Sequence, residues 1–171
     1  MSEQIDIETT LESGCYISAD KAQIEQVLLN LIMNSIDAMR GIRDGMRCLR
    51  LSLCATADQL IEVAVKDSGR GIPRDKRPKI FDAFWTTKQK GLGMGLPLCR
   101  AILESYGGRI WCEDNDAGGI TFRFRLPMTE QQEQRSGKSA MAGSPRSNES
   151  NAPLAFHENA DARLTRAGRE S

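Results

Sequence analysis

The sequence lacks several features that mark particular classes of protein. Its 171 residues include 23 basic and 23 acidic side chains, so no excess charge favours nucleic acid or an anionic membrane as a main partner. No apolar run approaches the roughly 18 residues that a membrane-spanning helix needs. The N-terminal stretch MSEQIDIETT has no charged region followed by an apolar core, unlike a signal peptide. We therefore expect a cytoplasmic protein that neither spans a membrane nor binds nucleic acid.

The sequence also lacks C-x-x-C pairs and has little histidine. Five cysteines are present, none of them in a C-x-x-C pair, with apolar residues beside them. They favour reduced thiols of a cytosolic protein over the alternative of a metal or redox site. The single histidine, His157, lies in a polar stretch near the C-terminus.

Composition divides the chain near Pro127. Residues 129–171 are rich in Ser, Asn, Ala, Gly, Arg and Glu, so we expect a folded domain over residues 1–128 and a disordered tail after it. Asp20 and Gln23 form a capping-box pattern at the start of a predicted helix. The periods of the apolar residues predict strands near 5–7, 49–53, 60–65, 109–113 and 120–126, and helices over 20–40 and 95–106. The predicted fold class is α+β, a two-layer sandwich with helices on one face of a mixed sheet.

The first of four distinctive segments lies on the longer predicted helix. Its polar side chains fall three or four residues apart and share one face: Gln23, Gln26, Asn30, Asn34 and Asp37. An apolar stripe occupies the opposite face: Ile24, Val27, Leu28, Leu31, Ser35 and Met39. Amide oxygens suit a hard cation such as Mg²⁺. On this segment alone, a solvated polar face is the favoured alternative.

The second segment, KDSGRGIP, follows an apolar strand. Asp67 ends that strand, and Gly69 and Gly71 allow positive φ and a close approach of the backbone. A buried carboxylate there could accept a hydrogen bond from the exocyclic amine of a base. An ordinary Asp-Gly turn explains the pattern equally well.

The third and fourth segments combine aromatic residues, hydroxyls and glycines. In IFDAFWTTK, three aromatic residues precede Thr87 and Lys88, which could contact phosphate; a core plug followed by a polar loop is the alternative. Gly91, Gly93 and Gly95 then alternate before a predicted helix, whose N-terminus would present free N–H groups to an anion. The spacing fits neither the P-loop nor G-x-G-x-x-G.

In this order the four segments resemble the ATP-binding domain of sensor histidine kinases, within the superfamily of gyrase, Hsp90, histidine kinase and MutL ATPases. QVLLNLIMNSIDAM is similar to the N box, DSGRGI to the first glycine box, IFDAFWTTK to the F box and GLGMGL to the second glycine box. GGITFRFRLP is similar to the closing strand. The resemblance runs from about residue 4 to residue 127 and implies an α/β sandwich of the Bergerat type.

The resemblance implies roles for the matching residues. Asn34 would bind the Mg²⁺ ion that bridges the ATP phosphates, and Asn30 and Lys88 would act beside it as catalytic residues. Asp67 would accept a hydrogen bond from the adenine amine. Gly119 and Thr121 would close the adenine pocket. The other nucleotide contacts would be Gly69, Gly71, Ile72, Thr87, Gly91, Leu92, Gly93, Gly95 and Leu96.

Asn30 bears on the reaction. The resemblance places a glutamate general base at this position in hydrolytic relatives, and an amide cannot take a proton from water. This favours transfer of the ATP γ-phosphoryl group to a histidine over hydrolysis, with a response regulator as the downstream partner.

The helical hairpin that would carry the acceptor histidine has no counterpart before the domain, and LAFHENAD around His157 does not resemble an acceptor motif. We therefore expect the histidine in a dimerisation domain in cis or in trans, and a monomer without that domain. The alternative is a stand-alone, ATP-gated interaction module, like the anti-sigma factors of the same superfamily.

Overall fold

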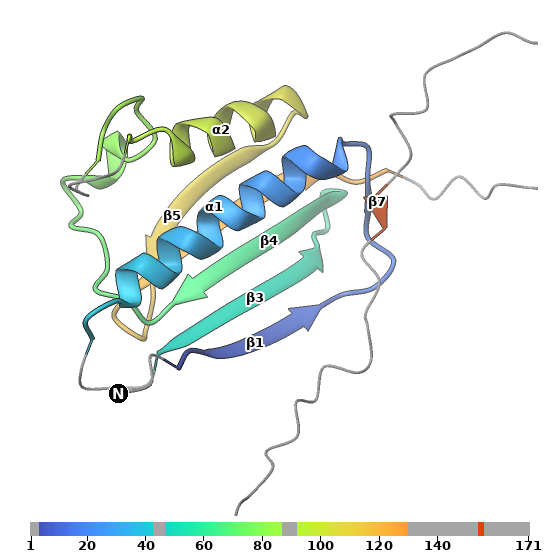
Figure 1. Cartoon of the computed structure of the whole chain (residues 1–171). Coiled ribbons are helices and arrows are strands. Elements are labelled where there is room, and N and C mark those ends of the chain that lie inside the picture. Colours follow the sequence, from blue (N-terminus) through green and yellow to red (C-terminus); the bar gives the residue numbers. More distant parts are fainter. Residues whose placement is uncertain (1–3, 43–46, 87–91, 130–153, 156–171) are drawn as a thin grey trace, which may run out of the picture.

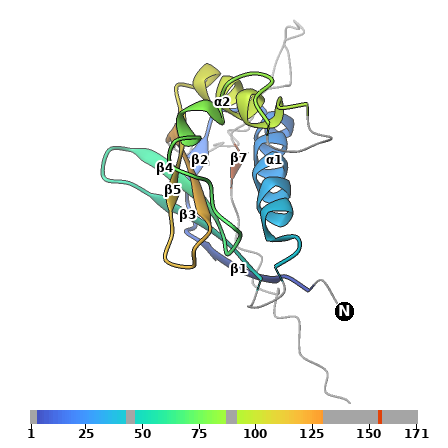
Figure 2. The ribbon, with the colours of Figure 1, turned by 90° about the vertical axis from the view of Figure 1, so that its left-hand side faces the viewer.

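The computed structural model of the chain describes residues 4–42, 47–86, 92–129 and 154–155. In this part, two α-helices pack on one face of a five-stranded sheet (Figures 1 and 2). In chain order the elements are β1 (Asp6–Leu11), β2 (Tyr16–Ile17), α1 (Lys21–Met39), β3 (Cys48–Ala55), β4 (Leu60–Asp67), a 3-10 turn (Arg77–Lys79), α2 (Gly95–Ser105), β5 (Arg109–Asp114), β6 (Ile120–Pro127) and β7 (Leu154–Ala155). The predicted two-layer α+β sandwich is confirmed.

The sheet is mixed, with the strand order β1-β3-β4-β6-β5. β1 runs parallel to β3, and the other neighbours in this sheet are antiparallel. Two parallel strands need a crossover between them, which α1 provides. Short connections join β3 to β4 and β5 to β6, whereas the connection from β4 to β5 is long and contains the 3-10 turn and α2.

Helix α1 begins at the predicted cap. Oδ1 of Asp20 accepts a hydrogen bond from the N–H of Gln23 at 3.0 Å. The return bond of a capping box runs through a third residue, because the Tyr106 hydroxyl accepts the Asp20 N–H at 3.1 Å and donates to Oε1 of Gln23 at 2.9 Å. Tyr106 directly follows α2, so this network also joins the two helices. Gly41, with φ of 77°, follows the C-terminal end of α1.

The strands place alternate side chains on the two faces of the sheet. In β6, Phe122, Phe124 and Leu126 belong to the buried core beneath the helices. Between them, Arg123 projects from the other face, where it pairs with Glu62 of β4 and Glu113 of β5. The outer face is therefore charged and cross-linked by ion pairs, and only the inner face packs against helices.

The structure also bears on the expectations from composition. All five cysteines are free thiols. None of the helices in the described ranges has both the length and the apolar character needed to cross a membrane. Of the predicted tail, residues 154–155 form β7, which pairs with β2 in an antiparallel ladder. Residues 130–153 and 156–171, which include His157, lie outside the described residues.

Candidate functional site

Asp67 is the last residue of β4, and only 2% of it is exposed. Its Oδ1 accepts hydrogen bonds from the backbone N–H groups of Gly69 at 2.8 Å and Ile120 at 3.3 Å. Burial raises the pKa of this carboxyl group, and those two N–H groups and the Ser35 hydroxyl oppose the rise. Because two donors already hold Oδ1, Oδ2 is the atom left to accept a hydrogen bond from a ligand.

Glycines surround this carboxyl group because side chains would not fit. A Cβ at Gly69 would lie 2.7 Å from Oδ1 of Asp67, and a Cβ at Gly119 would lie 2.5 Å from the same atom. Gly71 has φ of 71°, and a Cβ there would lie 3.0 Å from the carbonyl oxygen of Gly118. The loop after β4 and the turn between β5 and β6 therefore close directly onto Asp67.

Asn115 fixes the turn between β5 and β6 against the end of β4. Its Nδ2 donates to the carbonyl oxygen of Asp67 at 2.9 Å. Its Oδ1 accepts from the N–H groups of Ala117 at 2.9 Å and Gly119 at 3.2 Å. The sequence patterns did not single out Asn115, although asparagine in a predicted turn is a signal for this kind of bonding.

The loop after Asp67 is attached to the sheet through Arg77. The carbonyl oxygen of Ile72 accepts hydrogen bonds from Nε and Nη2 of Arg77 at 3.0 and 2.9 Å. Arg77 also pairs with Asp114 of β5 and holds the pKa of that carboxyl group below its ordinary value. Ile72 itself packs, partly buried, against the core.

A second cluster of predicted site residues lies between α1 and the start of α2. Asn34 lines a cavity of about 170 Å³ together with Ile80, Trp85, Leu92, Gly93, Gly95, Leu96 and Pro97. One turn earlier on α1, Nδ2 of Asn30 donates to the carbonyl oxygen of Gly95 at 3.5 Å. Oδ1 of Asn30 accepts from Nε2 of Gln26 at 3.2 Å. The two asparagines thus flank the point where α2 begins.

The N-terminus of α2 suits an anion. Gly95 is the first helical residue, and the N-cap, Met94, makes no side-chain capping hydrogen bond. The first N–H groups of a helix have no partner within the helix and carry its positive dipole end. Because residues of this first turn line the cavity, a phosphate group there would meet backbone donors.

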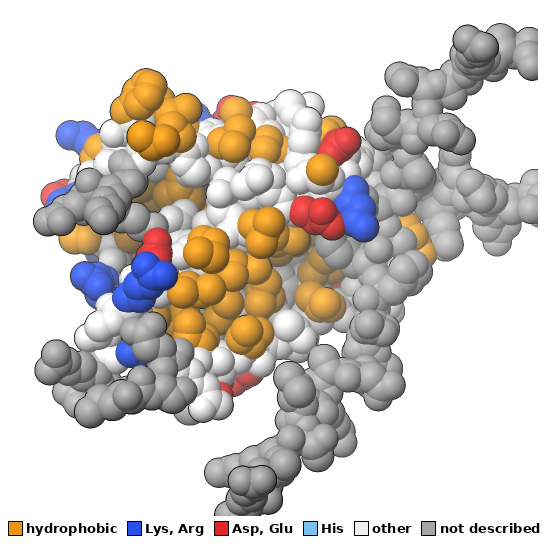
Figure 3. Space-filling view, viewed as in Figure 1, with side chains coloured by type: hydrophobic (Ala, Val, Ile, Leu, Met, Phe, Trp, Pro, Cys, Tyr) orange, Lys and Arg blue, Asp and Glu red, His pale blue; other side chains and the backbone are white. Residues whose placement is uncertain are grey.

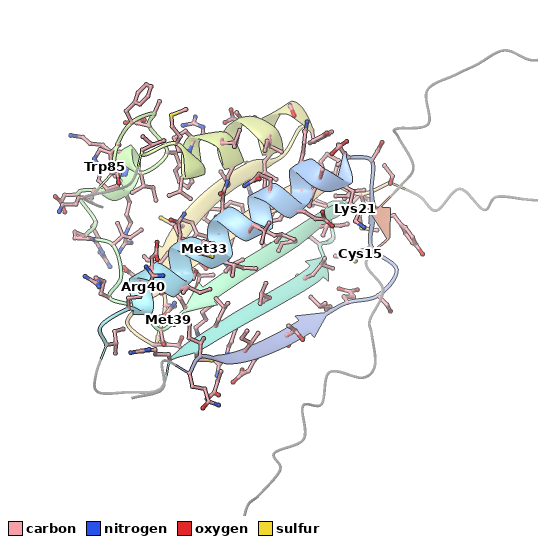
Figure 4. The ribbon with its side chains drawn as sticks, viewed as in Figure 1. Cys15, Lys21, Met33, Met39, Arg40 and Trp85 are labelled. Atoms are coloured by element: carbon pink, nitrogen blue, oxygen red, sulfur yellow. The ribbon has the colours of Figure 1, made fainter. Side chains whose placement is uncertain are left out.

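A backbone hydrogen bond joins the two ends of the loop ahead of α2. The N–H of Phe84 donates to the carbonyl oxygen of Gly93 at 3.1 Å. A Cβ at Gly93 would lie 2.6 Å from the backbone of both Phe84 and Trp85, so only glycine fits. Figure 4 shows Trp85 at the end of the molecule where α1 finishes with Met39 and Arg40. The predicted site residues of the intervening loop lie outside the described residues: Thr87, Lys88 and Gly91.

The structure does not bring Thr121 to the Asp67 carboxyl group. Ile120 and Phe122 belong to the core beneath the helices, and Thr121 between them lines a separate cavity with Lys66 on the outer face. The backbone N–H of Ile120 meets Asp67 instead. The alternation in Ile-Thr-Phe-Arg-Phe carries this signal, because neighbouring residues of a strand point to opposite faces. The role of Thr121 in closing an adenine pocket stays a prediction.

Comparison with known proteins matches the same part of the chain that forms the folded domain. Residues 19–130 match the model of the histidine kinase-, DNA gyrase B-, and HSP90-like ATPase family. The chain is 41% identical over 130 residues to the sensor protein FixL of Bradyrhizobium diazoefficiens, a match covering 75% of this chain and 25% of FixL. It is 37% identical over 115 residues to sporulation kinase C of Bacillus subtilis, covering 67% of this chain and 26% of that kinase. The chain thus spans about a quarter of the length of these relatives.

Solved structures agree with this match. The nucleotide-free catalytic domain of histidine kinase ThkA superposes with a TM-score of 0.64 at 34% identity, covering 73% of this chain and 80% of that one. Full-length ShkA in complex with AMPPNP superposes with a TM-score of 0.64 at 26% identity, covering 75% of this chain and 26% of that one.

Proposed function

The chain belongs to the histidine kinase-, DNA gyrase B-, and HSP90-like ATPase family as the ATP-binding domain of a histidine kinase, and we propose that it transfers the γ-phosphoryl group of ATP to a histidine in another domain or chain. The observation that carries this proposal is the amide at Asn30. It lies at the start of α2, hydrogen-bonded to Gly95, where the family resemblance places a glutamate in hydrolases. An amide cannot act as a general base toward water.

The adenine end of ATP would lie against Asp67. Oδ2 would accept the exocyclic amine of the base, while Oδ1 stays bonded to the N–H groups of Gly69 and Ile120. Gly71 and Ile72 would border the base in the loop that follows. Because Gly69 bears no side chain, the flat base can approach the backbone closely.

The phosphates would lie at the N-terminus of α2. Leu92, Gly93, Gly95 and Leu96 line the cavity there. Thr87, Lys88 and Gly91 would reach the phosphates from the loop between Phe84 and Gly93, by the family resemblance. In this arrangement the end of the site at Asp67 would bind the adenine base, and the end at the N-terminus of α2 would bind the charged phosphates.

The cavity also fits a magnesium ion. Mg²⁺ at a nucleotide takes most of its oxygen ligands from phosphates and water and few from the protein. Asn34 lines the cavity and can supply one amide oxygen. In the described ranges no group of three or more His, Cys, Asp or Glu side chains could form an all-protein site. Bound with ATP, the ion would neutralise phosphate charge, and Asn34 would position it.

Transfer breaks the bond between the γ-phosphorus and the oxygen that bridges it to the β-phosphate, forms an N–P bond to the histidine ring and leaves ADP. The domain contributes positioning and charge stabilisation more than covalent chemistry. The phosphoryl group then passes to a response regulator. We place the domain in the cytoplasm, where ATP is available.

The acceptor domain must reach the phosphate cavity, and exposed apolar side chains lie near residues that line it, in the loop before α2 and in the first part of that helix. Leu92 is 83% exposed and Phe84 76%, and Met94 and Leu98 are also exposed. Figure 3 shows hydrophobic side chains gathered over the loop before α2 and the start of that helix. Exposed apolar groups that gather in this way mark interaction surfaces. We propose that the histidine-bearing helix docks here.

The test has two stages. Calorimetry first measures ATP binding with and without Mg²⁺. The chain is then mixed with γ-labelled ATP and a separately purified, histidine-bearing dimerisation domain. The expected result is labelled partner whose phosphate is lost in acid and retained in alkali, as an N–P bond requires.

Two outcomes would contradict the proposal. Steady phosphate release without a partner would indicate a hydrolase. ATP binding without transfer to any histidine domain would favour the ATP-gated interaction module, which is the less favoured alternative because the relatives are sensor kinases.

A further inference from the structure

Ser35 occupies a core position of α1 but carries a polar group. It belongs to the predicted apolar stripe and is 0% exposed. Its hydroxyl oxygen has no hydrogen-bond partner among the described residues. Buried polar groups are nearly always paired, because an unpaired one loses its bonds to water without replacement. The hydroxyl at Ser35 therefore does not help the fold in this state.

The hydroxyl lies beside the Asp67 carboxyl group. A Cβ at Gly69 would lie 2.7 Å from both the Cβ of Ala38 and Oδ1 of Asp67, so this face of α1 lies against the carboxyl group. Consistent with this position, the Ser35 hydroxyl lowers the pKa of Asp67. The C-terminal half of α1 packs on the loop after β4, where the N–H of Arg70 donates to the carbonyl oxygen of Ala38 at 3.3 Å. Ser35 and Ala38 are three residues apart and share a face of α1. Ser35 thus faces the carboxyl group from the helix side.

The bonds of Asp67 leave one oxygen for Ser35. Oδ1 accepts from Gly69 and Ile120, which occupies both of its lone pairs. Oδ2 retains two lone pairs, so it can accept one hydrogen bond from a ligand and one from the Ser35 hydroxyl.

We propose that Ser35 is a positioning residue for recognition of the base: its hydroxyl donates to Oδ2 of Asp67 when the adenine amine is bound, and holds the carboxylate in the orientation that accepts that amine. This inference rests on the proposed role of Asp67 as the base acceptor. Ser35 acts through Asp67 and does not touch the phosphates.

The experiment compares two ligands on two proteins. Calorimetry measures the Kd of ATP and of purine riboside triphosphate, which carries hydrogen in place of the amine, at one fixed Mg²⁺ concentration. The native chain is compared with Ser35→Ala. We expect Ser35→Ala to weaken ATP binding about threefold to tenfold, the equivalent of one hydrogen bond, and to leave the Kd of the analogue unchanged.

A merely structural role would weaken both ligands equally, and this result would overturn the inference. If the native chain prefers ATP to the analogue and Ser35→Ala keeps this preference in full, the role of Ser35 is overturned and that of Asp67 stays intact. Equal binding of both ligands by the native chain would instead refute the assignment of Asp67, and with it this inference.

Stability supplies the second readout. Since the hydroxyl is unpaired without the base, Ser35→Ala should keep or raise the melting temperature of the ligand-free chain. A fall would contradict the argument that the hydroxyl does not help the fold. Ser35→Cys keeps the shape with a weaker donor and should fall between serine and alanine in its preference for ATP. Ser52→Ala, on the outer face of the sheet in β3, is the matched control and should leave both Kd values unchanged.

Discussion

Replacing Asp67 with asparagine separates recognition of the base from stability of the fold. The amide oxygen of asparagine can take over the bonds from Gly69 and Ile120, which hold Oδ1 at 2.8 and 3.3 Å. The amide nitrogen then takes the place of Oδ2 and faces the adenine amine. Both groups are hydrogen-bond donors, so no hydrogen bond forms between them. A hydrogen bond to a charged acceptor contributes about 1.5–3 kcal/mol. We expect ATP affinity to fall about tenfold to a hundredfold.

The same substitution should not weaken the fold at neutral pH. Burial raises the pKa of Asp67 in the folded state, so the folded chain binds this proton more tightly than the unfolded chain does. Its contribution to stability is therefore present below the ordinary aspartate pKa and is lost as pH rises through the raised folded value. Asparagine removes this dependence. The free energy of unfolding of the native chain should rise relative to Asp67→Asn on acidification through that window.

Calorimetry measures the ATP affinity, and urea unfolding at neutral and acidic pH measures the stability. Asp75→Asn is the matched control, because Asp75 is exposed in the loop that follows. It should change neither quantity. Normal ATP affinity in Asp67→Asn would refute the role of Oδ2. Lost affinity together with a large loss of stability would show that the carboxylate serves the fold and not the ligand.

Three other substitutions test the phosphate end. Gly93→Ala places a Cβ 2.6 Å from backbone atoms at a residue whose φ is 65°. We expect the free energy of unfolding to fall by about 1–3 kcal/mol and ATP binding to weaken. Urea unfolding identical to that of the native chain would contradict this reasoning. Phe84→Ser should keep ATP affinity within about twofold and reduce labelling of the histidine domain, and undiminished labelling would remove Phe84 from the docking surface. Asn30→Glu restores a general base and should raise phosphate release in a coupled assay, whereas no increase would mean that Asn30 does not decide between transfer and hydrolysis.

Regular elements could be predicted from the sequence because their signals are local. The period of apolar residues on α1 identifies its buried face, and Asp20 marks its start. The alternation in β6 likewise identifies the inward residues Phe122 and Phe124. It also predicts that Thr121, which lies between Ile120 and Phe122, points to the opposite face of the sheet. The resemblance to the family assigned Thr121 to the pocket, whereas the strand places Thr121 beside Lys66 in a cavity on the outer face of the sheet.

The missed parts of the site depend on contacts between distant residues. Ser35 reads as one more member of the apolar stripe, because the group that its hydroxyl faces lies on β4. Asn115 reads as an ordinary turn residue until its Nδ2 meets the carbonyl oxygen of Asp67 at 2.9 Å. Arg77 has no sequence signal that links it to the carbonyl of Ile72. Such pairings follow from the packing of helix, sheet and loop, which no local pattern specifies.

Helix α1 is the element that connects the two ends of the site. Ser35 faces Asp67, the proposed base acceptor, and Asn34, the preceding residue, lines the cavity proposed to hold the phosphates. Successive side chains of a helix point roughly 100° apart, so adjacent residues can serve two ends that lie on different sides of the helix. Asn30, one turn earlier, bonds to the start of α2 at 3.5 Å. The rigid backbone of α1 would therefore set the distance between the proposed base and phosphate sites. In the proposed binding mode, ATP would have to match that distance.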